Sequence, residues 1–130
     1  MAVKGIGVDL VEIQRMRFMI EKWGERFYRK VFTDEEIAYC LSRSRPYYSF
    51  AARFAAKEAF AKALGTGIGK VCGWKDVFVR VHQNGGPEIG LSEKLRERLT
   101  GHHIFLSLSH TQTMAIAMVV IDEDGKSRQA

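Results

Sequence analysis

Alternating apolar and polar positions near the start of the chain predict a β-strand over residues 3–11. Ile6, Val8 and Leu10 occupy every second position, with two glycines and Asp9 between them. Successive side chains of a strand point to opposite faces, so we expect the three aliphatic residues to be buried and Asp9 to lie on the other face. The glycines on that face would leave open space beside the Asp9 carboxylate.

Three helices are predicted between this strand and the middle of the chain. Over residues 12–23, apolar residues recur at spacings of three and four. Thr33 and Glu36 have the spacing of a capping box, which predicts a helix from there to about residue 42. Pro46 suits the first turn of a third, alanine-rich helix, which we expect to end at Leu64 because a glycine follows.

Two hairpins around a short helix are predicted for the second half of the chain. Their strands are expected over residues 77–81, 88–91, 104–109 and 114–121. Asn84-Gly85 is a typical hairpin turn, and Ser92 suits the N-cap of a helix that runs to about Thr100. The order of elements indicates an α+β fold with a mainly antiparallel sheet and one long alanine-rich helix.

Composition is typical of one globular domain. The chain has 130 residues, of which 46% are hydrophobic, and we expect a single domain over residues 1–130 with a polar tail from about residue 122. Cys40 and Cys72 are too few for a disulfide framework, so free thiols are expected. No apolar run approaches the roughly 20 residues of a membrane span, and the start does not resemble a signal peptide. These features predict a cytoplasmic protein without a membrane partner.

The net charge of +5 indicates an anionic partner without identifying it. Residues 15–30 carry six basic residues, among them Arg15, Arg26 and Lys30, against two acidic ones. Methionines lie among these charges, which suits an acidic helical partner. The same charges would suit a nucleic acid, and an ordinary solvated helix would also account for them.

Two acidic residues are candidates for chemistry. Asp9 could hold a metal ion or a donor, although it could also be a surface aspartate at a strand end. On the alanine-rich helix, Glu58 and Lys62 share one face, while Arg53 and Lys57 lie on another. The small residues between the two faces would allow a backbone or ligand to approach, or would simply pack as a buried helix.

Two further candidates are the glycine-rich loop over residues 65–69 and His110, which ends a predicted strand. Alternating glycines could point backbone N–H groups at an anion, but a helix stop followed by a turn explains the same pattern. Ser109 and His110 could form a hydrolytic pair, yet no nucleophile-elbow motif and no orienting carboxylate accompany them. We interpret His102 and His103 as surface histidines.

Taken together, three segments resemble one family. They are residues 5–13 (GIGVDLVEI), residues 53–62 (RFAAKEAFAK) running into the glycine loop, and residues 108–111 (LSHT). In this order and spacing they are similar to holo-acyl-carrier-protein synthase, the small bacterial type of 4′-phosphopantetheinyl transferase. The resemblance spans nearly the whole chain. It implies transfer of phosphopantetheine from coenzyme A to a serine of apo acyl carrier protein in fatty acid biosynthesis, with Mg²⁺, in a homotrimer whose active sites lie between subunits.

The resemblance also assigns roles to individual residues. It implies that Asp9 and Glu58 bind the metal and that Lys62 lies at the pyrophosphate, these three being the catalytic set. Residues implied to contact the coenzyme are Arg53, Lys62, Gly65, Thr66, Gly67 and His110. Those implied to dock the carrier protein are Arg15, Arg26 and Lys30.

A nucleic-acid-binding module is the rival interpretation. It explains the positive charge, but Asp9 and Glu58 in a binding face would repel phosphates unless a cation were present. The chain also lacks a basic run or an aromatic stacking platform. We therefore expect a transferase that does not bind nucleic acid.

Overall fold

Two antiparallel sheets and five helices make up the part of the chain that the computed structural model describes, residues 2–123. The elements are β1 (Ala2–Glu12), α1 (Ile13–Trp23), α2 (Glu25–Val31), α3 (Asp34–Ser42), α4 (Pro46–Leu64), β2 (Val77–Val81), β3 (Pro87–Leu91), α5 (Glu93–Arg98), β4 (His102–His110) and β5 (Met114–Glu123). The predicted α+β fold with antiparallel sheets and a long alanine-rich helix is confirmed.

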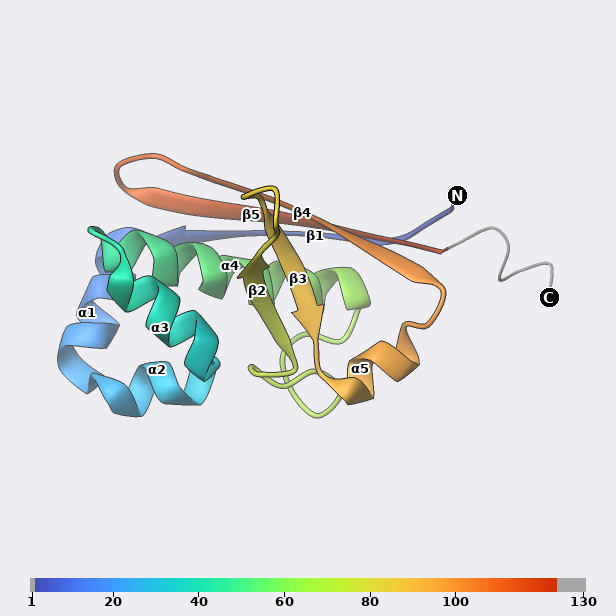
Figure 1. Cartoon of the computed structure of the whole chain (residues 1–130), viewed down its shortest axis with the longest axis horizontal. Helices are drawn as coiled ribbons and strands as arrows, with labels where there is room; N and C mark the ends of the chain where they lie inside the picture. Colours follow the sequence, from blue (N-terminus) through green and yellow to red (C-terminus); the bar gives the residue numbers. More distant parts are fainter. Residues whose placement is uncertain (1, 124–130) are drawn as a thin grey trace.

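The larger sheet has the strand order β1-β5-β4, and all five helices lie on one side of it (Figure 1). The smaller sheet is the hairpin β2-β3. In the larger sheet, β5 is the central strand, so its residues pair on both sides; for example, Ile116 lies between Leu10 of β1 and Ser109 of β4. Helix α4 runs along the covered face and contacts all three strands.

The burial expected for the first strand is wrong. Ile6, Val8 and Leu10 are 59%, 50% and 56% exposed, whereas Gly7 and Val11 on the opposite face are buried. The covered face is the glycine face because α4 lies directly on it. A Cβ atom on Gly7 would overlap the carbonyl oxygen of Ala59, and one on Gly5 would overlap that of Ala63, so only glycines permit this backbone approach.

Core residues fill the space between α4 and the elements around it. Seven of the buried core residues are alanines of α4 or β5, which bring helix and sheet close together: Ala51, Ala55, Ala56, Ala59, Ala63, Ala115 and Ala117. Larger side chains fill the other side of α4, where the Phe32 and Phe50 rings lie 5.0 Å apart. Burial of these side chains fixes α4 as the central element of the fold.

Most helix ends follow the predicted signals, although Ser92, the residue before α5, makes no side-chain cap hydrogen bond. The Thr33–Glu36 capping box forms, Pro46 begins α4, and Gly65 ends it with a φ of 90°. The predicted helix over residues 12–23 is α1, but the basic stretch behind it continues as a separate helix, α2, because the chain turns at Gly24 with a φ of 55°. That break was not predicted.

The predicted polar tail falls only in part on described residues. Asp122 and Glu123 belong to β5, and the remaining tail positions lie outside the described residues. Within residues 2–123, no helix combines the length and the apolar character needed to cross a bilayer.

Candidate active site

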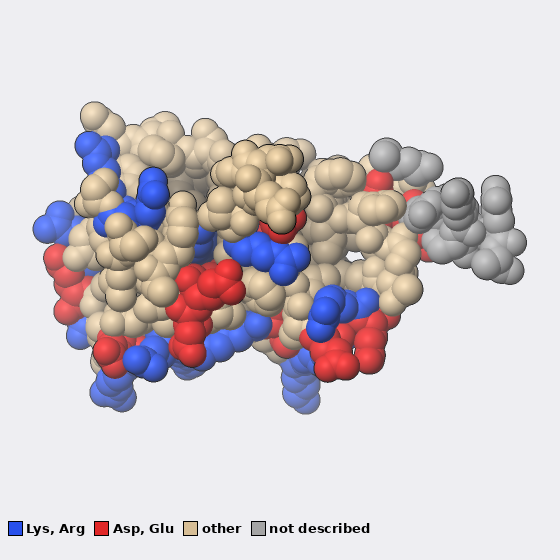
Figure 2. All heavy atoms as spheres, viewed as in Figure 1, with Lys and Arg blue, Asp and Glu red and all other residues tan. Residues whose placement is uncertain are grey.

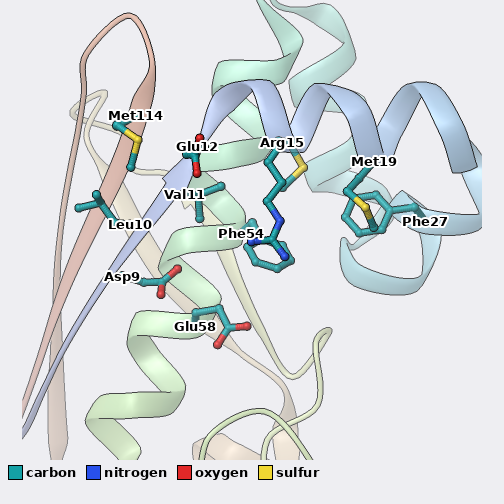
Figure 3. A pocket seen from close by; sticks show the side chains of 11 residues that line it. Asp9, Leu10, Val11, Glu12, Arg15, Met19, Phe27, Phe54, Glu58 and Met114 are labelled. Carbon is teal, nitrogen blue, oxygen red and sulfur yellow. The ribbon is translucent and has the colours of Figure 1, made fainter.

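The close packing of β1 on α4 places the two candidate carboxylates side by side. Asp9 comes two residues after Gly7 on the covered face of β1, and Glu58 directly precedes Ala59, the residue whose carbonyl oxygen Gly7 meets. Figure 3 shows the two side chains next to each other at one end of a pocket. Residues that are 49 positions apart in the sequence therefore present hard oxygen atoms to one space.

That pocket has a volume of ≈ 550 Å³, which is within the range of small-molecule sites. Its acidic lining residues are Asp9, Glu58 and Glu12, and the apolar side chains of Met19 and Phe27 lie at the far side from Asp9 (Figure 3). Arg15 reaches from α1 into the space between these two groups of side chains (Figure 3). The remaining lining residues are Leu10, Val11, Met16, Phe54 and Met114.

The charges in the pocket are unevenly compensated. Lys62 Nζ lies 3.2 Å from Asp9 Oδ1 and donates a hydrogen bond of 2.9 Å to the Val8 carbonyl oxygen. Burial raises the pKa of Glu58, and the nearby Asp9 carboxylate raises it further, while Lys62 opposes this in part. The part of this rise that comes from Asp9 reflects two neighbouring carboxylates of like charge, which a bound cation would stabilise.

Asp9 and Glu58 suit Mg²⁺ better than a softer metal. Mg²⁺ takes oxygen ligands and is commonly held by one or two carboxylates, with substrate phosphates and water completing its shell. Among residues 2–123, no cluster of three or more His, Cys, Asp or Glu residues forms a ready-made metal cage. The pair therefore fits a metal that arrives with a phosphate ligand rather than one bound by the protein alone.

Arg53 and His110 lie apart from this pocket. They line a second, smaller pocket of ≈ 180 Å³, together with Tyr48, Ser49, Ala52, Leu108 and Ser109. Arg53 is buried, with 6% of its surface exposed, and its Nε–H has no hydrogen-bond acceptor. The structure thus divides the predicted coenzyme contacts of a single chain between two places.

The glycine loop forms a helix stop, not an anion cradle. The N–H groups of Gly65, Thr66 and Gly67 all donate to the carbonyl oxygen of Ala61. Because the last carbonyls of a helix lack intrahelical partners, this capping satisfies α4 and uses the amides that an anion would need. Of the two interpretations of this loop, the structure supports the turn; any contact of Gly65, Thr66 or Gly67 with a coenzyme would use other groups.

The basic segment is divided between two helices. Arg15 on α1 lines the large pocket, while Arg26 and Lys30 are exposed on α2 and do not line it. Part of the positive charge is paired locally, for example Arg29 with Glu25 at 3.2 Å. Figure 2 shows Lys and Arg interspersed with Asp and Glu at this helical end of the molecule, rather than a uniform basic face.

Sequence reasoning missed the buried pair Lys57–Glu36 and most of the apolar pocket wall. Lys57 Nζ lies 2.8 Å from Glu36 Oε1, and both side chains are 0% exposed. No local signal connects these two residues, because α3 and α4 meet only in the tertiary structure. Phe54 could have been found, since it precedes Glu58 by four residues and shares its helix face.

Comparison with known proteins gives a consistent result. The profile of the 4′-phosphopantetheinyl transferase superfamily matches residues 5–119. A holo-[acyl-carrier-protein] synthase of Chlamydia trachomatis serovar L2 is 45% identical over 118 residues, covering 91% of this chain and 98% of that protein.

Two solved structures share the fold. A holo-[acyl-carrier-protein] synthase of Neisseria meningitidis matches with a TM-score of 0.86 and 33% identity over 93% of this chain and 99% of that one. One from Bacillus anthracis, in complex with coenzyme A (3′,5′-ADP), matches with a TM-score of 0.80 and 36% identity over 96% of this chain and 100% of that one. This chain belongs to the 4′-phosphopantetheinyl transferase superfamily.

Proposed function

We propose that this chain transfers the 4′-phosphopantetheine group from coenzyme A to a serine of apo acyl carrier protein, in the cytoplasm and for fatty acid biosynthesis. The observation that carries the proposal is the placement of Asp9 and Glu58 beside each other in a ligand-sized pocket of a chain from this superfamily. Lys62 adds to it, because its Nζ donates a hydrogen bond to Asp9. The Bacillus anthracis relative, which is 36% identical, was solved with coenzyme A.

The reaction requires positioning and charge compensation. The serine hydroxyl loses its proton to a base, its oxygen forms a bond to the β-phosphorus of the coenzyme pyrophosphate, and the bond to the departing adenosine 3′,5′-bisphosphate breaks. Positioning and electrostatic stabilisation dominate such transfers. Asp9 and Glu58 would hold Mg²⁺, which when bound neutralises phosphate charge. Lys62, whose side chain is 54% exposed, can offset charge on the leaving group from the same side.

The wall opposite the carboxylates suits an acidic helix of the carrier protein. Arg15 has no ion-pair partner among the residues that the structure describes, and it lies beside the apolar side chains of Met19 and Phe27 (Figure 3). An unpaired cation next to an apolar surface matches a helix that carries both acidic and apolar residues. Arg26 and Lys30 would extend this docking surface along α2.

A homotrimer with active sites between subunits accounts for the open face of the large sheet. Its exposed side chains form an apolar patch, which in a soluble protein usually marks an interface: Ile6, Val8, Leu10, Phe105 and Met118. The aliphatic face of β1 is not covered within the chain, and a second copy of the chain would cover it.

The two pockets lie at opposite edges of that open face. Leu10 lines the large pocket at the β1 edge, and Ser109 lines the second pocket at the β4 edge; both pair with Ile116 of β5. If the β4 edge of one copy meets the β1 edge of the next, Arg53 and His110 approach the carboxylates of a neighbour. Contacts between unlike edges close into a ring when the rotation between successive copies permits it, and a trimer is one such ring.

The decisive experiment is the intact mass of an apo acyl carrier protein after incubation with this protein, coenzyme A and Mg²⁺. We expect a gain of one phosphopantetheine group, and no gain when EDTA replaces Mg²⁺. An unchanged mass with several carrier proteins would contradict the proposed reaction. A gain in mass that persists in EDTA would support the proposed reaction and contradict the requirement for Mg²⁺.

The oligomer is tested separately by sedimentation. Wild-type protein is expected to sediment as a trimer, and Val8→Lys as a monomer with reduced transfer activity, because a charge on the open face cannot be buried in a subunit contact without a partner. Val81→Lys is the control, since Val81 is similarly exposed, at 46%, on the other sheet. A monomeric wild type that transfers phosphopantetheine would contradict the trimer alone.

A further inference from the structure

Arg53 is a buried cation without an internal anion. Only 6% of its surface is exposed, its Nε–H lacks an acceptor, and no carboxylate among residues 2–123 forms an ion pair with it. Burial of an unpaired charge is unfavourable unless another group compensates it. The guanidinium lines the second pocket beside His110, so an anion in that pocket would supply the missing partner.

The Tyr39 ring makes a cation–π contact with this guanidinium. Arg53 Cζ lies 4.2 Å from the centre of the Tyr39 ring, a distance typical of a guanidinium stacked on an aromatic face. Stacking uses the flat face of the guanidinium and leaves its N–H edges available. Tyr39 therefore restricts the orientation of Arg53 without using the groups that would bind an anion.

The position of Tyr39 is itself well determined. It lies on α3, three residues after Glu36, whose carboxylate caps the first turn of α3 and pairs with Lys57 of α4. The helix that carries Tyr39 is thus tied to the helix that carries Arg53. The Tyr39 hydroxyl makes no hydrogen bond within residues 2–123, so the aromatic ring is the part of the residue that acts on Arg53.

We propose that Tyr39 is a positioning residue for coenzyme binding: its ring holds the Arg53 guanidinium so that a free N–H edge faces the second pocket and binds a phosphate group of coenzyme A. The inference rests on the proposed function, because that function supplies the anion. It adds a residue of α3 that touches neither the coenzyme nor the reacting atoms.

The alternative is that Tyr39 only fills space between α3 and α4. The two roles differ in whether the effect of a Tyr39 substitution on coenzyme affinity requires Arg53. If Tyr39 acts through Arg53, its removal has no effect on coenzyme affinity once Arg53 is absent. If Tyr39 only packs, the effects of the two substitutions on affinity are independent and add.

The test measures coenzyme A binding by calorimetry, together with the KM and kcat of phosphopantetheine transfer, for the assembled protein. Tyr39→Leu is expected to bind coenzyme A about three- to tenfold more weakly, the range for loss of one cation–π contact, with little change in kcat. Tyr39→Phe is expected to bind within about twofold of wild type because the ring remains. Arg53→Ala is expected to lose more than Tyr39→Leu, and the double variant no more than Arg53→Ala.

Three results would overturn the inference. They are wild-type affinity in Tyr39→Leu, a loss in Tyr39→Phe equal to that in Tyr39→Leu, or a double variant weaker than Arg53→Ala by the full Tyr39→Leu factor. Tyr39→Met replaces Tyr39→Leu if thermal unfolding shows that the latter does not fold, since methionine adapts to the space without a π face. A wild type that binds no coenzyme A would overturn the proposed function and this inference together, whereas the other results leave the function intact.

Discussion

Helix α4 carries two lysine–carboxylate pairs in contrasting environments. Lys57 and Glu36 are 0% exposed with their charged atoms 2.8 Å apart, whereas the Lys62 and Asp9 side chains are 54% and 18% exposed with a separation of 3.2 Å. In the sequence the two lysines are five positions apart on one alanine-rich helix. Their environments, not their residue types, assign them different roles.

The buried pair has no capacity left for a ligand. Lys57 Nζ also donates to the carbonyl oxygens of Trp74 and Val77, at 2.8 and 2.6 Å. Glu36 also accepts hydrogen bonds from the backbone N–H groups of Thr33 and Val79. Burial lowers the pKa of Lys57, and Glu36 opposes this. The Lys57–Glu36 network thus satisfies its own donors and acceptors and connects α3, α4 and β2. The Lys62–Asp9 pair, here called the open pair, is partly exposed, so that its charged groups are accessible to a substrate.

The largest effect is expected on stability, from Lys57→Met. This substitution leaves the Glu36 carboxylate buried without its cation and two carbonyl oxygens without a donor, a loss of about 3–5 kcal/mol in the free energy of unfolding. Urea denaturation measures it. The double variant Lys57→Met/Glu36→Gln should recover part of the loss, because the unpaired charge is gone. Stability within about 1 kcal/mol of wild type in the single variant would contradict the role given to this pair.

The second prediction concerns catalysis and the open pair. Lys62→Met is expected to lower kcat by about 10²–10³-fold, as for removal of a group that stabilises transition-state charge. The free energy of unfolding should change by less than about 1 kcal/mol, because exposed ion pairs contribute little. Rates follow from the mass of the carrier protein in single-turnover reactions.

Lys94→Met is the matched control for this prediction. Lys94 pairs with Asp76 at 3.1 Å with exposures of 56% and 22%, nearly those of Lys62 and Asp9, but away from both pockets. It should reproduce the stability effect of Lys62→Met without the loss of rate. An equal loss of rate in the two variants would contradict the proposed role of Lys62 in stabilising charge in the transition state.

The parts of the fold that could be predicted are those set by local sequence signals. The Thr33–Glu36 capping box, Pro46 and Gly65 each act on their own helix end, so the bounds of α3 and α4 follow from the sequence. The face of β1 does not, because alternation reveals two faces without saying which one meets the helix. Here Gly7 meets Ala59, and the aliphatic face stays open.

The candidate site was predicted as far as it depends on recognisable motifs. The structure brings Asp9, Glu58 and Lys62 together, which is the set that the resemblance implied. It places Arg53 and His110 in a separate, second pocket. No sequence pattern predicts that two faces of α4 line different pockets. The Lys57–Glu36 pair depends on the contact of α3 with α4, so only the tertiary structure reveals it.

The third prediction concerns a cation outside both pairs. Arg15 lines the large pocket without an ion-pair partner among the described residues, so Arg15→Glu should leave stability nearly unchanged. We expect it to raise the KM for carrier protein about tenfold, with little change in the KM for coenzyme A, because reversing a charge at a docking surface slows association. Arg98→Glu, an exposed arginine of α5, is the control. An equal rise in both KM values would argue against docking by Arg15.

The smallest effect is expected from Glu58→Gln on stability in metal-free buffer. The pKa of Glu58 in the folded protein is raised, first by burial and then by Asp9. Between the ordinary pKa of glutamate and this raised value, the folded state binds more protons than the unfolded state, so the free energy of unfolding falls as pH rises through that window. Above it, ionised Glu58 destabilises the fold, and Glu58→Gln should therefore be more stable than wild type at pH values of about 7.5 and lose that advantage at acidic pH.

Urea denaturation in EDTA measures the stability at both pH values. Glu12→Gln is the control, because Glu12 is an exposed glutamate of the same pocket. An advantage of Glu58→Gln that is the same at both pH values would mean that a glutamine side chain packs better than glutamate at this position. The stability effect would then not come from ionisation of a partly buried glutamate beside Asp9, the feature on which the proposed metal site depends.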